Sequence, residues 1–166
     1  MRTLVFMRHA KSGGMRPGLT DFERPLTARG QKEAPAMARQ ISRRAVYPDL
    51  ILSSPAVRAV MTARLVAQEM ALPDHAIRVD SALYEALVDQ YLDVIRTLPD
   101  DAQSVLLVGH NPTITDFINL LASSSIAEMP AGGIAAVEAE LKAWSEIRKD
   151  CGKLLFFEHP ARDGSR

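Results

Sequence analysis

The apolar positions of the chain form short continuous runs, and two of these runs end in the same way. The first, LVFM, leads directly into Arg8 and His9, and the second, VLLV, leads through a glycine into His110. Apolar runs of this length between turn residues are typical of strands that are buried on both faces. The pattern therefore predicts buried strands at Thr3–Met7 and Ser104–Val108, each with a histidine just beyond its end.

The same pattern assigns four more strands and four helices to the rest of the chain. Short apolar runs predict strands at Leu50–Leu52, Ile77–Val79, Ile134–Glu140 and Lys153–Glu158, the last two as neighbours. The segments between strands predict helices at Thr27–Arg43, Pro55–Met70, Asp89–Leu98 and Pro112–Ala122. Strands that alternate with helices form a largely parallel sheet covered on both faces. The expected fold class is α/β, a three-layer α/β/α sandwich with a mostly parallel central sheet.

Two of the predicted helices carry signals at their starts. Thr27 is a typical N-cap, and the tripeptide SSP at residues 53–55 supplies a cap and a proline at the first helical position. Pro35 lies inside the first helix and predicts a kink. The segment Ala10–Pro25, rich in glycine and proline, predicts a loop. It is longer than the roughly 12–15 residues beyond which structureless loops are usually functional or disordered.

Basic residues and histidines follow three of the predicted strands. The first strand leads to Arg8 and His9, the second leads to Arg58 in the next helix, and the strand at Ser104–Val108 leads to His110. In parallel sheets ligands bind outside the carboxyl ends of the strands, where helix N-termini add unpaired N–H groups. These residues therefore predict a site for a dianion. Phosphate is the natural candidate, because a guanidinium binds its oxygens in a bidentate fork.

The two histidines point to phosphoryl transfer. Histidine serves as nucleophile, acid or base near neutral pH, and phosphoryl transfer needs a nucleophile, charge stabilisation and a proton for the leaving group. One neutral imidazole can attack while the other, kept cationic by the phosphate, stabilises charge. Glu85, just after the strand at Ile77–Val79, is the candidate acid, with a solvated carboxylate as the alternative. Ser12 is a candidate phosphate contact, with a solvated loop residue as the alternative.

Composition narrows the classes of partner. The 166 residues include 20 Lys and Arg and 20 Asp and Glu, and this zero net charge argues against a general nucleic-acid binder. The length of 166 residues favours one domain over residues 1–166, and 47% hydrophobic residues are enough to form its core. The one cysteine, Cys151, cannot form an internal disulfide.

No apolar stretch approaches the roughly 18 residues of a membrane span, and the N-terminal run is too short for a signal peptide. We therefore expect no membrane association and a cytoplasmic location.

Taken together, the polar segments resemble the histidine phosphatase superfamily, whose fold is called phosphoglycerate-mutase-like. Each matching piece alone is a weak signal, but five in the family order, from the first strand to about Leu121, are specific. They are Arg8-His9-Ala10, Arg24-Pro25-Leu26-Thr27-Ala28-Arg29-Gly30, LSSPAVRA at residues 52–59 with Thr62-Ala63, Leu83-Tyr84-Glu85, and Gly109-His110-Asn111-Pro112. The family's first motif usually has a glycine where this chain has Ala10. That difference would matter if the position required a positive φ.

The resemblance implies a metal-independent phosphatase without a cofactor. It implies His9 as the nucleophile that becomes phosphohistidine, Glu85 as the general acid, and the remaining residues as a phosphate clamp, namely Arg8, Arg58 and His110. The segments after His9 and before Glu85 are too short for the lids of the longer mutases and sugar bisphosphatases. The chain end, GKLLFF, and the Arg-Pro-Leu-Thr motif resemble the short SixA-type phosphohistidine phosphatases. An open site suits a phosphorylated protein as substrate, and a small phosphate ester is the alternative.

Two other interpretations stay open at this point. The first is a metal-dependent hydrolase with His9, His110 and Glu85 as ligands of an open zinc site. Against it, Arg8 would repel a metal ion, and the sequence has no His-x-x-x-His spacing. The second is a non-catalytic module that only binds phosphate, although no group needed for the chemistry is missing.

Overall fold

A single six-stranded sheet extends through the chain. The computed structural model describes residues 1–161, so residues 162–166 of the expected domain lie outside the described part. The strand order is β3-β2-β4-β1-β5-β6. Each predicted strand is present, with its ends within one residue of the expected positions; the strands span Arg2–Arg8 (β1), Leu50–Ser53 (β2), Ile77–Val79 (β3), Ser104–Gly109 (β4), Ile134–Ala139 (β5) and Gly152–Glu158 (β6).

The sheet is mostly parallel, as predicted. β1 pairs in parallel with β4, β4 with β2, and β2 with β3. β5 is antiparallel to β1, and β6 is antiparallel to β5, so β6 again runs in the direction of β1. Within this sheet, β5 is the one strand that runs against the others.

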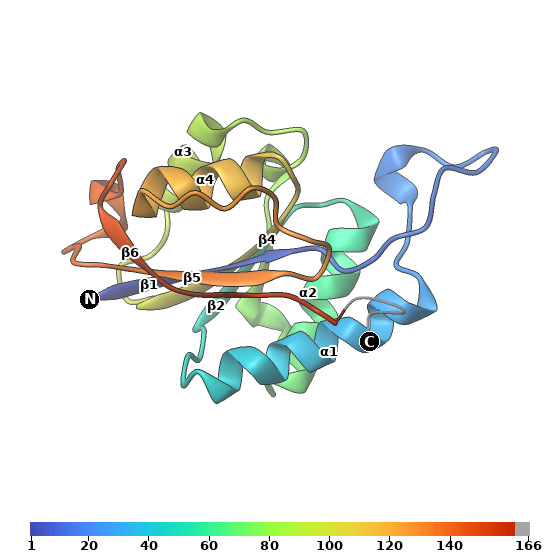
Figure 1. Ribbon diagram of the computed structural model, residues 1–166, viewed down its shortest axis with the longest axis horizontal. Coiled ribbons are helices and arrows are strands. Elements are labelled where there is room, and N and C mark those ends of the chain that lie inside the picture. The colour runs from blue at the N-terminus through green and yellow to red at the C-terminus, as the bar shows by residue number, and fades with distance from the viewer. Residues whose placement is uncertain (162–166) are drawn as a thin grey trace.

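Helices cover both faces of the sheet and complete the three-layer sandwich (Figure 1). One face carries α1 and α2, which pack against each other, and the other face carries α3 and α4. The α-helices span Ala28–Arg43 (α1), Val57–Glu69 (α2), Val88–Arg96 (α3) and Thr113–Ala122 (α4). Short 3-10 helices lie at Asp21–Glu23, Asp74–Ala76, Ser81–Leu83 and Trp144–Glu146.

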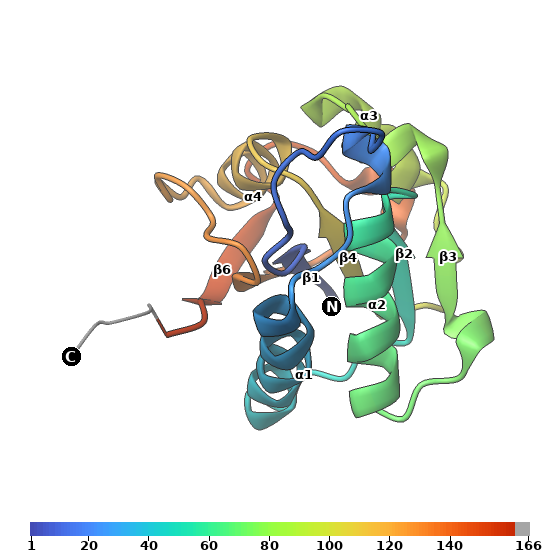
Figure 2. The ribbon, with the colours of Figure 1, turned by 90° about the vertical axis from the view of Figure 1, so that its right-hand side faces the viewer.

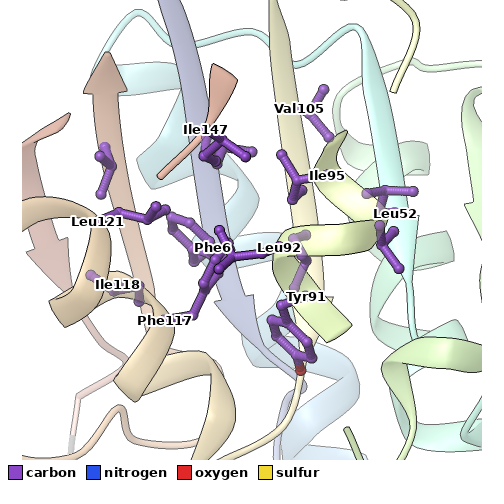
Figure 3. Close-up of a cluster of buried hydrophobic side chains, with 14 of the residues drawn as sticks. Phe6, Leu52, Tyr91, Leu92, Ile95, Val105, Phe117, Ile118, Leu121 and Ile147 are labelled. Carbon is purple, nitrogen blue, oxygen red and sulfur yellow. The ribbon is translucent and has the colours of Figure 1, made fainter. Parts of the chain in front are cut away.

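Two apolar clusters, one on each face, hold the layers together. Under α3 and α4, Phe6 of the central strand meets the edge of the Phe117 ring at 5.6 Å, and Phe117 meets Tyr91 at the same distance (Figure 3). All three are almost fully buried. The Tyr91 hydroxyl accepts a hydrogen bond from the backbone N–H of His110. This cluster therefore reaches directly to the end of β4, where the predicted site lies.

The two predicted helix starts have different outcomes. Thr27 caps α1 as expected, since its hydroxyl accepts a hydrogen bond from the N–H of Gly30 at 3.1 Å. The helix expected from residue 55 instead begins at Val57, with Ala56 as its N-cap and no side-chain cap. The prediction of a serine cap at this helix is wrong, because the Ser54 hydroxyl contacts His110 and the N–H of Ala56 just before the helix.

The register of the sheet places the predicted site residues at one edge. Arg8 lies opposite Gly109 across the β1–β4 pair, and Ser53 lies opposite Val108 across the β2–β4 pair. The carboxyl ends of β1, β2 and β4 therefore meet, as parallel strands require. The segment after β1, coloured blue in Figures 1 and 2, extends outward from this edge and returns to the start of α1.

Candidate active site

Two contacts fix the tautomer of His9. Its Nδ1 lies 2.8 Å from the carbonyl oxygen of Ala10, and because a carbonyl only accepts, Nδ1 carries the proton. Arg58 Nε donates to the other ring nitrogen, Nε2, over 3.3 Å. An arginine N–H can donate there only to a lone pair. His9 is therefore the Nδ1–H tautomer, with an unshared electron pair on Nε2.

Burial keeps the His9 ring neutral. The residue is 6% exposed, and loss of solvation is the largest cause that lowers its pKa to about 3. The nearby charges of His110, Arg58 and Arg8 lower the pKa further, while the hydrogen bond to the Ala10 carbonyl acts in the opposite direction. An imidazole that stays unprotonated at neutral pH has the form required of a nucleophile.

Arg58 is a buried cation with all three nitrogens engaged. Beside its contact with His9, Nη1 donates to the backbone carbonyl of Asp21 at 2.7 Å, and Nη2 donates to Asp21 Oδ2 at 3.1 Å. Arg58 lies in the first turn of α2, as the sequence spacing predicted. A guanidinium beside the Nε2 of His9 is placed to bind the oxygens of a phosphate that this nitrogen attacks.

His110 faces His9 from the end of β4. The two ring centroids are 5.2 Å apart, and His110 Nε2 lies 2.7 Å from the hydroxyl oxygen of Ser54. Burial is the main cause that lowers the pKa of His110 to about 4, and the Arg58 charge adds to it. Its Nδ1 is buried and, among the described residues, has no hydrogen-bond partner.

Arg8 brings a second guanidinium to this edge from the end of β1. Its Nη1 donates to the carbonyl of Met129 at 3.0 Å, while its buried Nε has no hydrogen-bond partner within residues 1–161. Burial lowers the pKa of Arg8, Glu128 raises it and Arg58 lowers it. A buried donor without a partner is costly, so an anion would satisfy it. We call the four residues Arg8, His9, Arg58 and His110 the His–Arg cluster.

Ala10 is accommodated without strain beside the His–Arg cluster. Its N–H donates to the hydroxyl of Thr62 at 3.0 Å, and that hydroxyl donates to the carbonyl of Arg58 at 2.8 Å. Among the described residues, Ala10 is not one of those with a positive φ. The alanine in place of the family's glycine therefore fits the turn, and Thr62 ties the turn to α2.

Asp21 is the main contact of the site that the sequence analysis missed. It lies in the short 3-10 helix Asp21–Glu23 of the loop after β1, and its Oδ2 accepts from both Arg58 and the hydroxyl of Tyr84, at 3.1 and 2.7 Å. Its Oδ1 accepts from Arg24 at 3.1 Å. The hydrogen bond from Tyr84 is the largest cause that lowers the pKa of Asp21 to about 2. No local signal marks this residue, because its partners come from distant segments.

The structure links Glu85 and Ser12 to the site less directly. Glu85 is exposed and has a left-handed backbone with φ of 52°, between Tyr84 and the start of α3. Its carboxylate therefore lies in solvent next to a residue that contacts Asp21. Ser12 accepts a hydrogen bond from Arg24 at 3.1 Å. The roles predicted for Glu85 and Ser12 stay predictions.

A known family model matches the part of the chain that contains most of this site. The family model of the histidine phosphatase superfamily (branch 1) matches residues 4–91, more than half of the chain. The chain belongs to the histidine phosphatase superfamily. The matched segment contains Arg8, His9, Arg58 and Glu85, while His110 reaches the superfamily site from the strand beyond it.

Curated relatives of this histidine phosphatase extend the match along nearly the whole chain. The Mycobacterium tuberculosis protein Rv1276c is 30% identical over 164 residues, which cover 93% of this chain and 99% of the relative. The Mycobacterium leprae protein ML1117 is 27% identical over 166 residues, again covering 93% and 99%. Both are described as uncharacterized proteins.

Solved structures with the same fold carry SixA names. A candidate phosphohistidine phosphatase SixA from Nakamurella multipartitia superposes with a TM-score of 0.84 at 28% identity, covering 97% of each chain. One from Agrobacterium tumefaciens gives 0.80 at 29% identity, covering 96% of this chain and 98% of that chain. The protein histidine phosphatase SixA complexed with tungstate gives 0.79 at 23% identity, covering 95% and 96%, and this last likeness shows the fold alone.

Proposed function

We propose that this protein is a phosphatase that hydrolyses a phosphomonoester or a phosphohistidine through a covalent phosphohistidine on His9. The observation that carries the proposal is the state of His9, a buried and neutral imidazole whose Nε2 lone pair contacts Arg58. The superfamily match and the likeness to structures named SixA support the same chemistry. A module that only binds phosphate has no need of a nucleophile prepared in this way.

The reaction has two steps on one nitrogen. Nε2 of His9 attacks the phosphorus, a P–N bond forms, and the bond to the leaving atom breaks with its electron pair staying on that atom. Water then attacks the phosphorus of the phosphohistidine. Inorganic phosphate leaves, and the electron pair returns to Nε2. The Ala10 carbonyl holds the Nδ1 proton throughout, so the ring carries the phosphoryl group with its charge partly neutralised.

The other members of the His–Arg cluster bind the phosphate. Arg8 and Arg58 supply guanidinium forks to its oxygens. His110, neutral in the structure, gains a proton when a dianion binds, because the nearby negative charge raises its pKa. Ser54 can donate to the neutral Nε2 or accept from the protonated one, so it holds the ring in either state. We propose Ser12 as a further contact, brought to the phosphate by its neighbour Arg24.

Glu85 is the proposed general acid for ester substrates. An alkoxide leaving group needs a proton as the P–O bond breaks, and the same carboxylate can then activate water. Because Glu85 is exposed, it reaches the leaving group only when a bound substrate lies next to it. This role is therefore specific to substrates whose leaving groups are strong bases.

We propose a phosphorylated protein as the substrate and a small phosphate ester as the alternative. The proteins named SixA in the comparisons are described as phosphohistidine phosphatases, and they match this chain over nearly its full length. The segments after His9 and between Arg58 and Glu85 are short and leave little room for the lid elements that enclose small substrates. We also propose that residues 1–166 form one domain and that the protein works in the cytoplasm without binding nucleic acid. Within residues 1–161, no helix has the length and apolar character to span a bilayer.

The proposed chemistry needs no metal ion or cofactor. In the described part of the chain, no three His, Cys, Asp or Glu side chains lie close enough together to share a metal ion. The zinc-site interpretation required His9, His110 and Glu85 to do so. The guanidiniums of the His–Arg cluster instead supply the positive charge that a metal would bring to phosphoryl transfer.

Steady-state assays in excess EDTA test this function. We expect wild-type enzyme to hydrolyse phosphohistidine, phosphoserine or sugar phosphate substrates in EDTA, and His9→Ala to lose turnover on all of them. His75→Ala is the matched control, because His75 is an exposed histidine just before β3, at the opposite end of the parallel strands from the cluster. Loss of wild-type activity in EDTA, or full activity in His9→Ala, would contradict the proposal.

A further inference from the structure

A row of ring contacts leads from the surface to His9. The Phe22 and Tyr84 rings meet edge to face at 5.1 Å, and Tyr84 meets His110 edge to face at 5.8 Å. His110 then lies 5.2 Å from His9. We call Phe22, Tyr84, His110 and His9 the aromatic row. Phe22 is 38% exposed and His9 is buried, so the row of contacts extends from the surface to the nucleophile.

The carboxylate of Asp21 contacts the aromatic row at Tyr84. Asp21 Oδ2 accepts from the Tyr84 hydroxyl at 2.7 Å, and the Asp21 side chain is 48% exposed. Tyr84, Arg24 and Arg58 all donate to this carboxylate and hold its pKa at about 2, so it is ionised at neutral pH. An ionised carboxylate cannot donate a proton, and it repels a leaving group that becomes negative.

Asp21 lies within reach of the phosphate position. Arg58 contacts Asp21 through Nη1 and Nη2 and contacts His9 through Nε, so a single guanidinium separates the carboxylate from the nucleophilic nitrogen. A phosphate bound between His9 and Arg58 is therefore close to the Asp21 carboxylate and to the Tyr84 ring that contacts it.

We propose that Tyr84 and Asp21 form the leaving-group subsite and select a phosphorylated imidazole over a phosphorylated phenol or alcohol. The inference rests on the proposed function and adds the residues that decide which phosphate is accepted. Tyr84 packs against a planar ring, and the Asp21 carboxylate accepts the N–H of the imidazolium form. When the phosphate draws Arg58 Nη2 away, Oδ2 of Asp21 gains room for that N–H.

The bond changes balance without an acid. In a phosphohistidine whose other ring nitrogen is protonated, the P–N bond breaks as Nε2 of His9 bonds to phosphorus. The electron pair returns to the leaving nitrogen, and the product is a neutral imidazole that keeps its proton on the other nitrogen. That N–H remains hydrogen-bonded to Asp21 throughout. Glu85 therefore has no proton to supply for this substrate.

Other leaving groups lack one or both of the features that this subsite binds, the planar ring and the N–H. The phenol of phosphotyrosine is planar and packs on Tyr84, but it has no N–H and becomes negative next to the Asp21 carboxylate. The serine side chain has neither a ring nor an N–H. The subsite therefore favours phosphohistidine over the other two phosphates. The Asp21 carboxylate favours imidazole over phenol, and the Tyr84 ring favours aromatic over aliphatic leaving groups.

The test compares kcat/KM on three peptides of one sequence that carry phosphohistidine, phosphotyrosine or phosphoserine. For Asp21→Asn we expect a fall of roughly tenfold or more on phosphohistidine, the size expected for a lost charged hydrogen bond. On phosphotyrosine and phosphoserine we expect a smaller fall, because neither leaving group donates an N–H to this carboxylate. Asp101→Asn, an exposed carboxylate in the loop before β4, is the matched control and should leave all three values unchanged.

A second variant measures the effect of the Tyr84 ring apart from that of the Asp21 carboxylate. Tyr84→Leu should lower kcat/KM on both aromatic phosphates more than on phosphoserine. Equal losses on all three peptides in Asp21→Asn and in Tyr84→Leu would overturn the inference, because these residues would then only position Arg58. A wild-type enzyme that turns over none of the peptides would instead overturn the proposed function and this inference with it.

Discussion

Arg58 and His9 are in direct contact: the Nε of the guanidinium donates to the Nε2 of the imidazole over 3.3 Å. Both residues are 6% exposed. A permanent cation at this distance opposes protonation of the ring and keeps the electron pair available. The same cation is where the oxygens of an attacked phosphate would bind. One contact thus prepares the nucleophile and positions its target.

Stability should fall as the pH is lowered from 7 to 5. His9 and His110 have pKa values of about 3 and 4 in the folded protein, below the ordinary value of 6.5. Between pH 6.5 and the folded pKa values, the unfolded chain therefore binds more protons than the folded protein. The contribution of these histidines to the free energy of unfolding is fully present above about pH 6.5 and is lost progressively as the pH falls toward 4 and 3. Each histidine contributes on the order of 2 kcal/mol between pH 7 and pH 5, since one pKa unit corresponds to about 1.4 kcal/mol.

Urea unfolding at both pH values measures this dependence. His9→Gln should show a smaller loss of stability on acidification than wild type, because one of the two histidines no longer titrates. His75→Gln is the control and should behave as wild type. If His9→Gln and wild type lost the same free energy, burial would not hold the ring neutral.

Arg58→Ala should lower kcat/KM by about a hundredfold to a thousandfold. Removing a group that stabilises transition-state charge has an effect of this size. Arg58→Lys should recover only part of the loss, because an ammonium cannot bind phosphate in a bidentate fork. Arg39→Ala is the matched control, since Arg39 is an exposed helix residue paired with Glu69. A loss of less than threefold in Arg58→Ala would show that this guanidinium does not touch the substrate.

Glu85→Gln should affect substrates in the order of leaving-group basicity. The loss should be largest on an alkyl phosphate, smaller on p-nitrophenyl phosphate and smallest on phosphohistidine, because a strongly basic leaving group depends most on the acid. The measurement is kcat/KM for the three substrates with both enzymes. An equal loss on the alkyl and the nitrophenyl ester would remove Glu85 as the acid.

Ser54→Ala should misplace His110 and lower stability. Ser54 is fully buried and its hydroxyl lies 2.7 Å from His110 Nε2, so its removal takes away the partner of a partly buried nitrogen. Such a loss costs about 1–3 kcal/mol. Urea unfolding should show this destabilisation, and the affinity for inorganic phosphate, measured as product inhibition, should weaken. Unchanged stability together with unchanged inhibition would mean that the contact has no role.

The sequence indicated the sheet and most of the His–Arg cluster because both follow from position along the chain. Apolar runs bounded by turns placed β1, β2 and β4, and parallel strands necessarily bring Arg8, His9 and His110 to one edge. Arg58 followed from its position about one helical turn after the SSP segment that ends β2. These inferences use spacing, and spacing is visible in a sequence.

The contacts of Asp21 and Ser54 could not be predicted in the same way. Asp21 meets Arg58 and Tyr84 only because the long loop after β1 folds back over the start of α2, and no local pattern encodes that path. The Ser54 hydroxyl was predicted to cap a helix, an ordinary use of serine, but His110 from another strand contacts it instead. Tertiary contacts replace local preferences at both positions.

The central claim, that Nε2 of His9 carries the phosphoryl group, is tested most directly by trapping the intermediate. Enzyme mixed with a ³²P-labelled phosphohistidine protein or p-nitrophenyl phosphate is quenched within milliseconds, digested and mapped by mass spectrometry. We predict an acid-labile, base-stable phosphoryl group on Nε2 of His9, absent from His9→Ala and present in His75→Ala. A wild-type enzyme that turns over substrate with its label on another residue, or with no label at any quench time, would contradict the account.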